Sequence, residues 1–421
     1  MKKSVALHTL GCKLNFSETS TIGRLLEDEG FIKKNFDEVA DIYVINTCSV
    51  TENADKECRM IVRRIQKKAP GAMVVITGCY AQLKPSEIAS IPGVDLVLGA
   101  AEKFNIAGHL KELTKSNSAK ICSCDIEDVN VFTSSHSLKD RTRVFLKVQD
   151  GCDYNCSFCT IPLARGKSRS DNIKNVINNV NLIAQEGTKE IVITGINLGD
   201  FGKAPDGKSS GENFLHLIKE LDKIDKIERF RISSIEPNLL SNDIIEFVCS
   251  SKKFMPHFHL PLQSGSNKIL GMMRRRYKKE LYAERVRLIK ELMPHCCVGV
   301  DVIVGFPGET EEDFRETVDF LFSLNISYLH VFTYSERDDT HALELAPIVP
   351  LNIRHERNKI LRNLSYKKMQ EFTVQHIGQK RKVLFEMHSK NGMMDGFTDN
   401  YIKVTVPQRH EWTNNIIMWQ I

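Results

Sequence analysis

The sequence predicts an α/β protein in three parts, and three observations carry that prediction. Its 421 residues exceed one ordinary domain. Short β-rich runs alternate with helical patterns along most of the chain, which is typical of parallel sheets covered by helices. Near residue 376 the pattern changes to short alternating strands. We therefore expect an open parallel α/β domain over residues 1–113, a partial (β/α)6 barrel over 138–370 and a small β-barrel over 374–421.

In the N-terminal part, a cysteine follows each of three expected strands. The strands cover 5–10, 41–46 and 73–77, and helices cover 18–29, a run up to about 68, and a stretch from Pro85. Cys12, Cys48 and Cys79 stand just past the strands. Because carboxyl ends of parallel strands share one edge of a sheet, these thiols are expected to converge on a metal site. Cys58 lies inside a helix and is expected to be structural.

A second group of thiols, Cys152, Cys156 and Cys159, forms a CxxxCxxC pattern. Neither spacing is helical, so we interpret it as a loop leaving a strand over 144–148. Three thiolates suit a four-iron cluster with one iron left open for chemistry. Tyr154 and Phe158 are expected to shield that cluster from water. A structural zinc site is the alternative, but it needs a fourth ligand, and the next histidine is distant in sequence, at position 216.

Composition narrows the class of protein. The net charge of +5, from 58 basic and 53 acidic residues, is too small to prove a nucleic-acid partner. Twelve cysteines are too sparse for a disulfide scaffold and fit a reduced compartment. The apolar run after Lys2 and Lys3 is too short for a signal peptide, and none reaches the roughly 18 residues of a membrane span. We expect a soluble cytoplasmic protein without membrane contact.

The central part is expected to contribute six barrel strands, over 144–148, 190–194, 229–233, 258–260, 298–304 and 328–332. Helices over 172–185, 213–221 and 281–291 lie between them. Barrel-like sheets place chemistry at the carboxyl ends of strands. The candidates at those ends are Gly195, Asn197, Ser233, Glu236, Gln263 and Gly305. Each is also explained as a turn residue that needs no ligand.

Several basic and aromatic residues are candidates for contact with RNA. Arg165, Lys167 and Arg169 follow the second cysteine group, either as a solvated face or as phosphate ligands. The basic run 274–279 has the same two interpretations: it is either a solvated face or part of a surface that contacts the RNA backbone. The stretch 113–139 is expected to be a linker with an edge element, in which Cys122 and Cys124 are structural.

The C-terminal part is expected to form strands over 382–387, 401–406 and 416–421, with turns at Gly392 and Gly396, and a charged helix over 354–375 precedes it. RNA backbone contacts and base stacking suit six of its residues, although some of the aromatics are expected to fill a small core instead. These residues are Lys380, Arg381, Lys382, Phe397, Tyr401 and Trp412.

The cysteine patterns carry a resemblance to known families. CxxxCxxC with an aromatic residue before the last cysteine resembles the radical S-adenosylmethionine (SAM) superfamily. The segments TLGCKLN (9–15), NTCSV (46–50) and TGCYAQ (77–82) resemble the three motifs of the methylthiotransferase N-terminal domain. GFTDNY (396–401) is similar to a signature of the TRAM domain, an OB-like RNA-binding barrel.

This resemblance implies two [4Fe-4S] clusters, held by Cys12, Cys48 and Cys79 and by Cys152, Cys156 and Cys159. SAM is then chelated by the open iron of the second cluster and cleaved to a radical, while another SAM supplies a methyl group to sulfur at the first. The main chain of Phe158 is expected near adenine. The implied neighbours of SAM at the strand ends are Gly195 and Asn197 at its amino group, Ser233 and Glu236 at its ribose or carboxylate, Gln263, and Gly305 near adenine.

The family likeness implies methylthiolation at C2 of N6-threonylcarbamoyladenosine, at position 37 in the anticodon loop of tRNA. That C2–H bond is not acidic, so a radical route suits it. An isopentenyladenosine-specific tRNA enzyme and an enzyme acting on an aspartate of a ribosomal protein use the same scaffold. A non-enzymatic RNA-binding iron–sulfur sensor is the alternative from another class. A flavodoxin- or ferredoxin-like electron donor is expected, and the sulfur donor is unknown.

Overall fold

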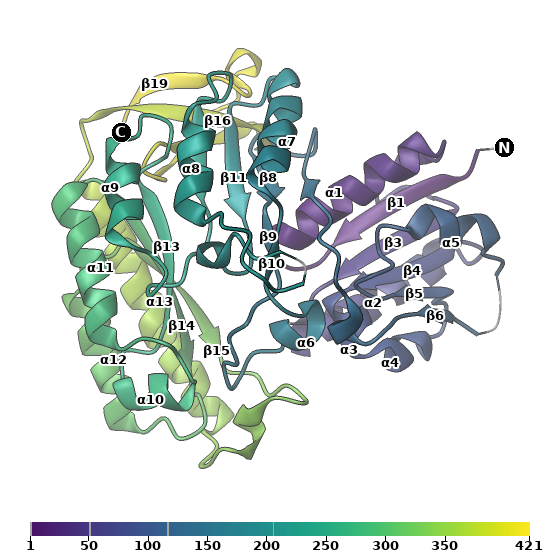
Figure 1. Cartoon of the computed structure of the whole chain (residues 1–421), viewed down its shortest axis with the longest axis horizontal. Coiled ribbons are helices and arrows are strands. Elements are labelled where there is room, and N and C mark those ends of the chain that lie inside the picture. The colour runs from purple at the N-terminus through teal and green to yellow at the C-terminus, as the bar shows by residue number, and fades with distance from the viewer. Residues whose placement is uncertain (1, 50–51, 116–117, 205) are drawn as a thin grey trace.

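The computed structural model describes residues 2–49, 52–115, 118–204 and 206–421, so Val50 of the second motif lies outside it (Figure 1). The N-terminal sheet has six parallel strands in the order β2-β1-β3-β4-β5-β6. They are β1 (Ser4–Thr9), β2 (Ile32–Lys34), β3 (Ile42–Thr47), β4 (Met73–Gly78), β5 (Leu96–Leu98) and β6 (Lys120–Cys122). The predicted open parallel sheet is confirmed. Its edge strand β6 extends the sheet past the expected boundary at residue 113, into the stretch expected to be a linker with an edge element.

Helices cover both faces of this sheet, and its central strands β3 and β4 are accordingly buried along almost their whole length. The helices are α1 (Lys13–Asp28), α2 (Glu52–Lys68), α3 (Cys79–Leu83), α4 (Pro85–Ala89) and α5 (Ile106–Glu112). Ile22 of α1 and Leu110 of α5 pack on one face, and Val62 of α2 packs on the other. Helix α1 begins at Lys13 rather than at the predicted Glu18, because the chain turns sharply at Gly11 (φ +96°) and Cys12 caps the helix.

The central region is an open curved sheet of parallel strands with helices outside it. Strands β8 (Val144–Lys147), β11 (Glu190–Thr194) and β12 (Arg229–Ile232) form one half, with the short antiparallel β7 (Ser135–His136) at its edge. Strands β13 (His257–Gln263), β14 (Cys297–Val304) and β15 (Tyr328–Thr333) form the other. Two isolated parallel bridges, Phe230 to Phe254 and Ser234 to His259, join the halves. The predicted alternation of strands and helices is confirmed.

The helices around this sheet agree with the sequence pattern within a few residues. They are α7 (Ile173–Gln185), α8 (Phe214–Asp222), α9 (Asn242–Ser250), α10 (Asn267–Met272), α11 (Lys279–Leu292), α12 (Glu311–Ser323) and α13 (Leu351–Val374). Leu260 and Leu262 of β13 pack in the core, so the alternate residues His257 and His259 are directed to the inside of the curve. Strand β13 was expected to end at Leu260, but it continues to Gln263.

The C-terminal region is a four-stranded antiparallel sheet in the order β18-β17-β16-β19. Its strands are β16 (Lys380–Lys390), β17 (Met393–Thr398), β18 (Lys403–Pro407) and β19 (Ile416–Gln420). The predicted turn at Gly392 is confirmed. The turn predicted at Gly396 is wrong: this glycine lies inside β17, where a Cβ atom would stand 2.6 Å from the Val383 side chain. Tyr401, expected in a strand, lies in the preceding turn with φ +68°.

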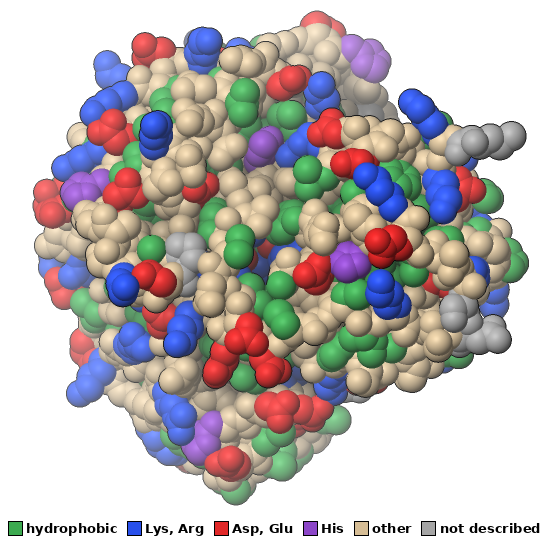
Figure 2. All heavy atoms as spheres, turned by 45° about the vertical axis from the view of Figure 1, so that its right-hand side comes forward, with side chains coloured by type: hydrophobic (Ala, Val, Ile, Leu, Met, Phe, Trp, Pro, Cys, Tyr) green, Lys and Arg blue, Asp and Glu red, His purple; other side chains and the backbone are tan. Residues whose placement is uncertain are grey.

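Trp412 packs on Phe385 and Trp419 in a small core, so it fills the interior. The sheet docks on the central region through charged groups: Arg143 donates to Glu386 at 2.8 Å, and Arg229 donates to the Lys382 carbonyl at 2.7 Å. Basic and acidic side chains are interspersed over the face shown in Figure 2, in keeping with the small net charge. Among the described residues, no helix is long and apolar enough to cross a bilayer.

Candidate metal centres and substrate cavity

The structure brings Cys12, Cys48 and Cys79 together at one edge of the N-terminal sheet. They follow neighbouring strands, whose last pairs are Thr9 with Asn46 and Thr47 with Gly78. A Cβ atom on Gly11 would stand 2.7 Å from the Cys48 sulfur. Burial raises the pKa of Cys79, and the nearby Cys12 thiol raises it further. The convergence predicted from the strand ends is therefore present in the structure.

The second cysteine group lies in the loop between β9 (Gln149–Asp150) and α6 (Ile161–Arg165). The backbone N–H of Tyr154 donates to the Cys152 sulfur at 3.4 Å, and Arg275 Nη1 donates to the Cys156 sulfur at 3.2 Å. Burial raises the pKa of all three thiols, to about 12 for Cys152 and Cys159. Burial disfavours ionisation of the three thiols to thiolates. N–H donors and the positive charge of a shared metal centre stabilise the thiolates that bind it.

The spacing of the sulfurs distinguishes a cluster from zinc. Among the described residues, the histidine, cysteine and carboxylate groups whose ligand atoms lie within 4.8 Å of one another are only His259, Asp301 and His330. The sulfurs of each triad are therefore farther apart than ligands of one zinc ion need to be. In a four-iron cluster each cysteine binds a different iron, so wider spacing is expected.

The two triads are neighbours across the junction of the two domains. Thr160, which follows Cys159, donates its hydroxyl to the carbonyl of Ser49, which follows Cys48, at 3.5 Å. Helix α3 begins at Cys79 and contacts α6, which follows the second triad. Segments more than 60 residues apart in sequence are thus joined at one place.

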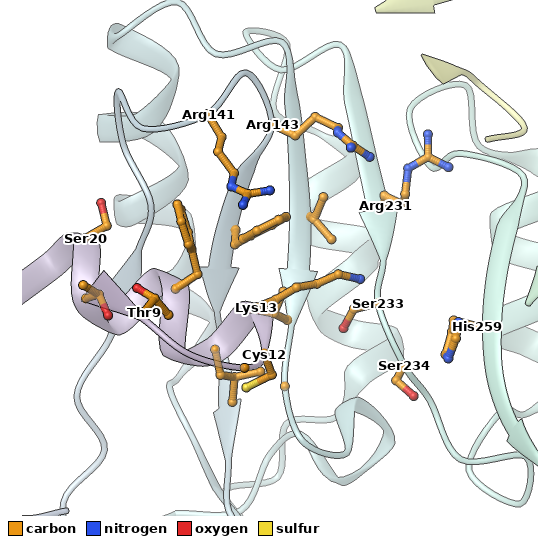
Figure 3. A pocket seen from close by; sticks show the side chains of 18 of the residues that line it. Thr9, Cys12, Lys13, Ser20, Arg141, Arg143, Arg231, Ser233, Ser234 and His259 are labelled. Atoms are coloured by element: carbon orange, nitrogen blue, oxygen red, sulfur yellow. The ribbon is translucent and has the colours of Figure 1, made fainter. Parts of the chain in front are cut away.

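A cavity of about 1080 Å³ opens between the domains (Figure 3). Cys12, Lys13 and Cys48 line it from the N-terminal domain, and the strand ends Gly195 and Ser233 line it from the central sheet. Its other walls carry Arg143, Arg231, His257, His259, His330 and Tyr401. The cavity therefore joins the N-terminal cysteines to the strand ends that the sequence predicts as cofactor neighbours.

Comparisons with known proteins agree with this geometry. A family model described as "Radical SAM superfamily" matches residues 146–321, and one described as "Uncharacterized protein family UPF0004" matches residues 4–99. The threonylcarbamoyladenosine tRNA methylthiotransferase MtaB of Bacillus subtilis is 39% identical to this chain, over 99% of this chain and 93% of the relative. MtaB of Aquifex aeolicus is 40% identical, over 95% and 96%. The chain belongs to the MtaB family of tRNA methylthiotransferases.

More distant proteins share parts of this likeness. A tRNA-2-methylthio-N(6)-dimethylallyladenosine synthase of Clostridium botulinum is 31% identical over 91% of this MtaB-family chain and 86% of the relative. Among solved structures, the radical SAM methyltransferase TsrM of Kitasatospora setae superposes with a TM-score of 0.57 at 16% identity. That match covers 79% of this chain and 73% of TsrM, and it shows a shared fold.

Around the second triad of this MtaB-family chain, the predicted shielding residues lie where they exclude water. Tyr154 is buried, its hydroxyl accepts from Asn238 at 2.8 Å, and the Arg276 guanidinium stacks 4.0 Å from its ring centre. Phe158 contacts Phe306 edge to face, with ring centres 6.4 Å apart. Their assignment to SAM remains a prediction.

The strand-end candidates differ in what they offer a ligand. Ser233 Oγ and Asn197 Oδ1 are buried and have no hydrogen-bond partner among the described residues, so both are free to bind one. Gly195 lines the cavity, where a Cβ atom would stand 2.9 Å from Gln149 Oε1. Each of the three remains a candidate SAM neighbour.

The other three candidates are more constrained. Glu236 accepts a hydrogen bond from Arg275, which also donates to Cys156, so it orients a group on the cysteine loop. Gln263 ends β13 with φ +71°. Gly305 donates its N–H to Glu309 at 2.6 Å, and Arg354 fills the space beside it. Of these three, Glu236 is linked to the cysteine loop, and that link runs through Arg275.

Two predicted phosphate ligands are corrected by the structure. Arg165 is 3% exposed and forms ion pairs with Glu18 at 3.1 Å and Asp150 at 2.9 Å. Arg169 is also buried, and its guanidinium donates to the carbonyls of Val131 and Arg165 at 3.0 and 2.6 Å. Both guanidinium groups are buried and bound to other groups of the protein, so neither is available to RNA. Lys167, between them, is exposed and remains a candidate.

The candidates for RNA contact in the C-terminal sheet also divide into exposed residues and residues that are paired within the protein. Lys380 and Lys382 are exposed on β16, whereas Arg381 is paired with Asp399 at 3.0 Å. Phe397 and Tyr401 stack on each other, with ring centres 5.0 Å apart. They face the central region, where the Arg143 guanidinium lies 4.4 Å from the Phe397 ring centre. Of this aromatic pair, Tyr401 lines the cavity.

Sequence reasoning missed most of the cavity wall. His257 and His259 alternate along β13, and this period of two was the available signal for one shared face. Lys13 lies in the segment TLGCKLN (9–15), but that motif by itself indicates no role for it. Arg275 belongs to a basic run whose purpose was left open. The structure decides these cases by showing which side chains the fold turns inward.

Proposed function

We propose that this protein transfers a methylthio group to C2 of N6-threonylcarbamoyladenosine at position 37 of tRNA. One observation carries the proposal: two cysteine triads from distant segments meet at one domain junction, and Cys12 and Cys48 of the first line a cavity large enough for a nucleoside. The MtaB relatives, matched over nearly their full length, are named threonylcarbamoyladenosine tRNA methylthiotransferases.

Two [4Fe-4S] clusters fit the residues present, one on Cys12, Cys48 and Cys79 and one on Cys152, Cys156 and Cys159. Each triad supplies three ligands for four irons, whereas a closed structural zinc site takes four ligands. When bound, the clusters and SAM supply a hydrogen-abstracting radical, a methyl group and a place for sulfur.

The chain's own residues orient and protect this chemistry. Arg275 links the Cys156 sulfur to the Glu236 carboxylate and so fixes the loop that carries the second triad. Tyr154 and Phe158 keep bulk water away from that loop. Ser233 and Asn197 present unpaired polar atoms that suit the polar groups of SAM.

Contact with tRNA is assigned to exposed cations and to the C-terminal sheet, for which we propose a TRAM-like OB module. Lys167, Lys380 and Lys382 are exposed and suit phosphate contacts. A base in the single-stranded anticodon loop is splayed out at small cost, which lets it enter the cavity. None of the twelve cysteines forms a disulfide, which favours the cytoplasm, with a flavodoxin- or ferredoxin-like protein as electron donor.

Anaerobic reconstitution tests the proposal. The wild-type protein is expected to bind about eight irons, to form 5′-deoxyadenosine from SAM on reduction, and to methylthiolate tRNA that carries threonylcarbamoyladenosine. Replacing Cys12, Cys48 and Cys79 together by Ala should leave about four irons and SAM cleavage but remove methylthiolation. Cys249→Ser, at an exposed cysteine in α9, is the matched control and should behave as wild type.

Nucleoside mass spectrometry of the product tRNA gives the decisive readout. Iron near four in the wild-type protein, or SAM cleavage without any 2-methylthio nucleoside, would contradict the proposal. Failure to form 5′-deoxyadenosine in a protein with both clusters loaded would instead favour an RNA-binding iron–sulfur sensor.

A further inference from the structure

Lys13 is a cation inside the cavity with no partner of its own. It is the first residue of α1, directly after Cys12, and its side chain extends into the cavity toward Ser233 (Figure 3). Its accessible surface therefore faces the cavity. No hydrogen bond or ion pair joins its ammonium to any other residue that the structure describes.

Three of the neighbouring cations are paired with acids. Arg143 donates to Glu386 at 2.8 Å, and Arg231 donates to Glu190 at 3.0 Å. Lys33, which also lines the cavity, pairs with Asp140 at 3.1 Å. Arg141 instead lies over two aromatic rings, 4.4 Å from the ring centre of Phe16 and 5.8 Å from that of Phe145. Among the described cations that line the cavity, Lys13 has neither an acidic partner nor an aromatic one.

An unmatched ammonium in such a place favours an anionic guest. Lys13 lines the cavity together with Arg143 and Arg231, so a ligand there meets several positive charges. A ligand that fills the cavity displaces the water around this ammonium, and an opposite charge on the ligand offsets that cost. A carboxylate on the ligand supplies that charge and forms a charge-assisted hydrogen bond.

The opposite wall offers polar groups that can donate and accept hydrogen bonds. Ser233 Oγ is buried and has no partner among the described residues. His259 is held by Asp301 at 2.8 Å, and the His330 ring lies beside it, with ring centres 5.3 Å apart. Hydroxyl and urea groups match these donors and acceptors, whereas an isopentenyl group leaves them unpaired.

The covalent geometry of adenine places Lys13 on the correct side. C2 and N6 lie on the same edge of the base, one on each side of N1. A base that presents C2 to the cluster site at Cys12 can therefore bring its N6 substituent within reach of Lys13, which lines the same cavity.

We propose that the Lys13 ammonium binds a carboxylate on the N6 substituent and thereby selects anionic over apolar substituents. This inference rests on the proposed function, which supplies an adenosine methylthiolated at C2. Threonylcarbamoyl carries a carboxylate and a hydroxyl, and isopentenyl carries neither. Lys13 is thus a specificity-determining residue, distinct from the ligands of the clusters.

The test compares Lys13→Gln and Lys13→Arg with wild type on anticodon stem-loops. One stem-loop carries the threonylcarbamoyl carboxylate, the second carries its uncharged primary amide, and the third carries isopentenyladenosine. Dissociation constants by fluorescence anisotropy need no turnover, and KM and kcat follow from product formation. Iron content and the cluster absorption spectrum are recorded for each variant.

Wild type is expected to bind the carboxylate about 10- to 100-fold more tightly than the amide, the range of one charge-assisted hydrogen bond. Lys13→Gln should lose that preference through KM, with unchanged iron content, and Lys13→Arg should retain most of it. Lys33→Gln is the matched control, since its lysine is already paired, and should keep the wild-type preference.

Two results would overturn the inference. One is a Lys13→Gln variant that still prefers the carboxylate as strongly as wild type. The other is a variant that loses iron or changes its cluster spectrum without a change in preference, which makes Lys13 a counter-charge for the cysteines. If wild type binds the carboxylate selectively but yields no methylthiolated product, the proposed function fails, and Lys13 is then a binding residue for the carboxylate but not a determinant of substrate choice.

Discussion

At the scale of single residues, Arg165 shows how burial changes the meaning of a basic side chain. In sequence it belongs to a run of cations beside the cysteine loop. In the structure it lies in a buried network with Glu18 and Asp150, and Lys147 joins Glu18 at 3.0 Å. The cations hold the pKa of Glu18 well below its usual range despite its burial. Arg165 therefore joins the domains, since Glu18 belongs to α1 and Asp150 to the barrel.

Replacing Arg165 by Gln is expected to destabilise the protein by about 3–5 kcal/mol, because the carboxylates of Glu18 and Asp150 lose a buried partner. Urea unfolding of the apoprotein measures this change. Lys167→Gln, two residues away and exposed, should stay within about 0.5 kcal/mol of wild type but weaken tRNA binding. Equal stability of Arg165→Gln and wild type would contradict the structural role.

At the scale of elements, the strand ends decide where the N-terminal cysteines lie. Strand β4 ends at Gly78, which has φ +98° and caps α3. A Cβ atom there would stand 2.3 Å from the Thr47 carbonyl oxygen on β3. Only glycine allows the turn and the close approach together, so this position holds Cys79 beside Cys48.

Gly78→Ala is expected to lower the free energy of unfolding by well over about 1 kcal/mol, because strain and a clash with the backbone add together. It should also reduce the iron bound at the N-terminal triad, as measured by iron analysis after reconstitution. Gly30→Ala is the matched control: its φ is +88°, but nothing lies within 4 Å of the added Cβ. Similar losses in both variants would show that backbone strain alone matters.

At the scale of the whole molecule, the site exists only because the domains dock. Arg337, in the loop after β15, donates to Ser49 Oγ at 2.5 Å and pairs with Asp55 at 2.8 Å. All three groups are buried, and Ser49 follows Cys48. This contact fixes the N-terminal triad relative to the barrel.

Arg337→Gln is expected to uncouple the two halves of the reaction. SAM cleavage, which needs only the barrel triad, should change by less than about twofold, while methylthiolation falls about tenfold or more because the triads lose their alignment. Parallel assays of 5′-deoxyadenosine and methylthiolated nucleoside measure both. Lys84→Gln removes an exposed pair with Asp338 at the same junction and should have little effect. A proportional loss of both products in Arg337→Gln would contradict the docking role.

The sequence alone was sufficient for the parallel sheets, most helices and both cysteine triads. Periodicity marks the strands and helices, and topology sends Cys12, Cys48 and Cys79 to one edge wherever the sheet is parallel. The CxxxCxxC pattern is local in the sequence, so the cysteine loop Cys152–Cys159 could be predicted without tertiary information.

Only the tertiary structure decided what the charged and aromatic side chains do. Arg165 and Arg169 became internal partners, Phe397 and Tyr401 turned toward the barrel, and Lys13 remained unpaired in the cavity. The physical reason is that a charge or ring is defined by its neighbours, and those neighbours come from strands and domains more than 100 residues away in sequence. Local patterns fix where the backbone goes, whereas long-range packing fixes which groups are left free to bind.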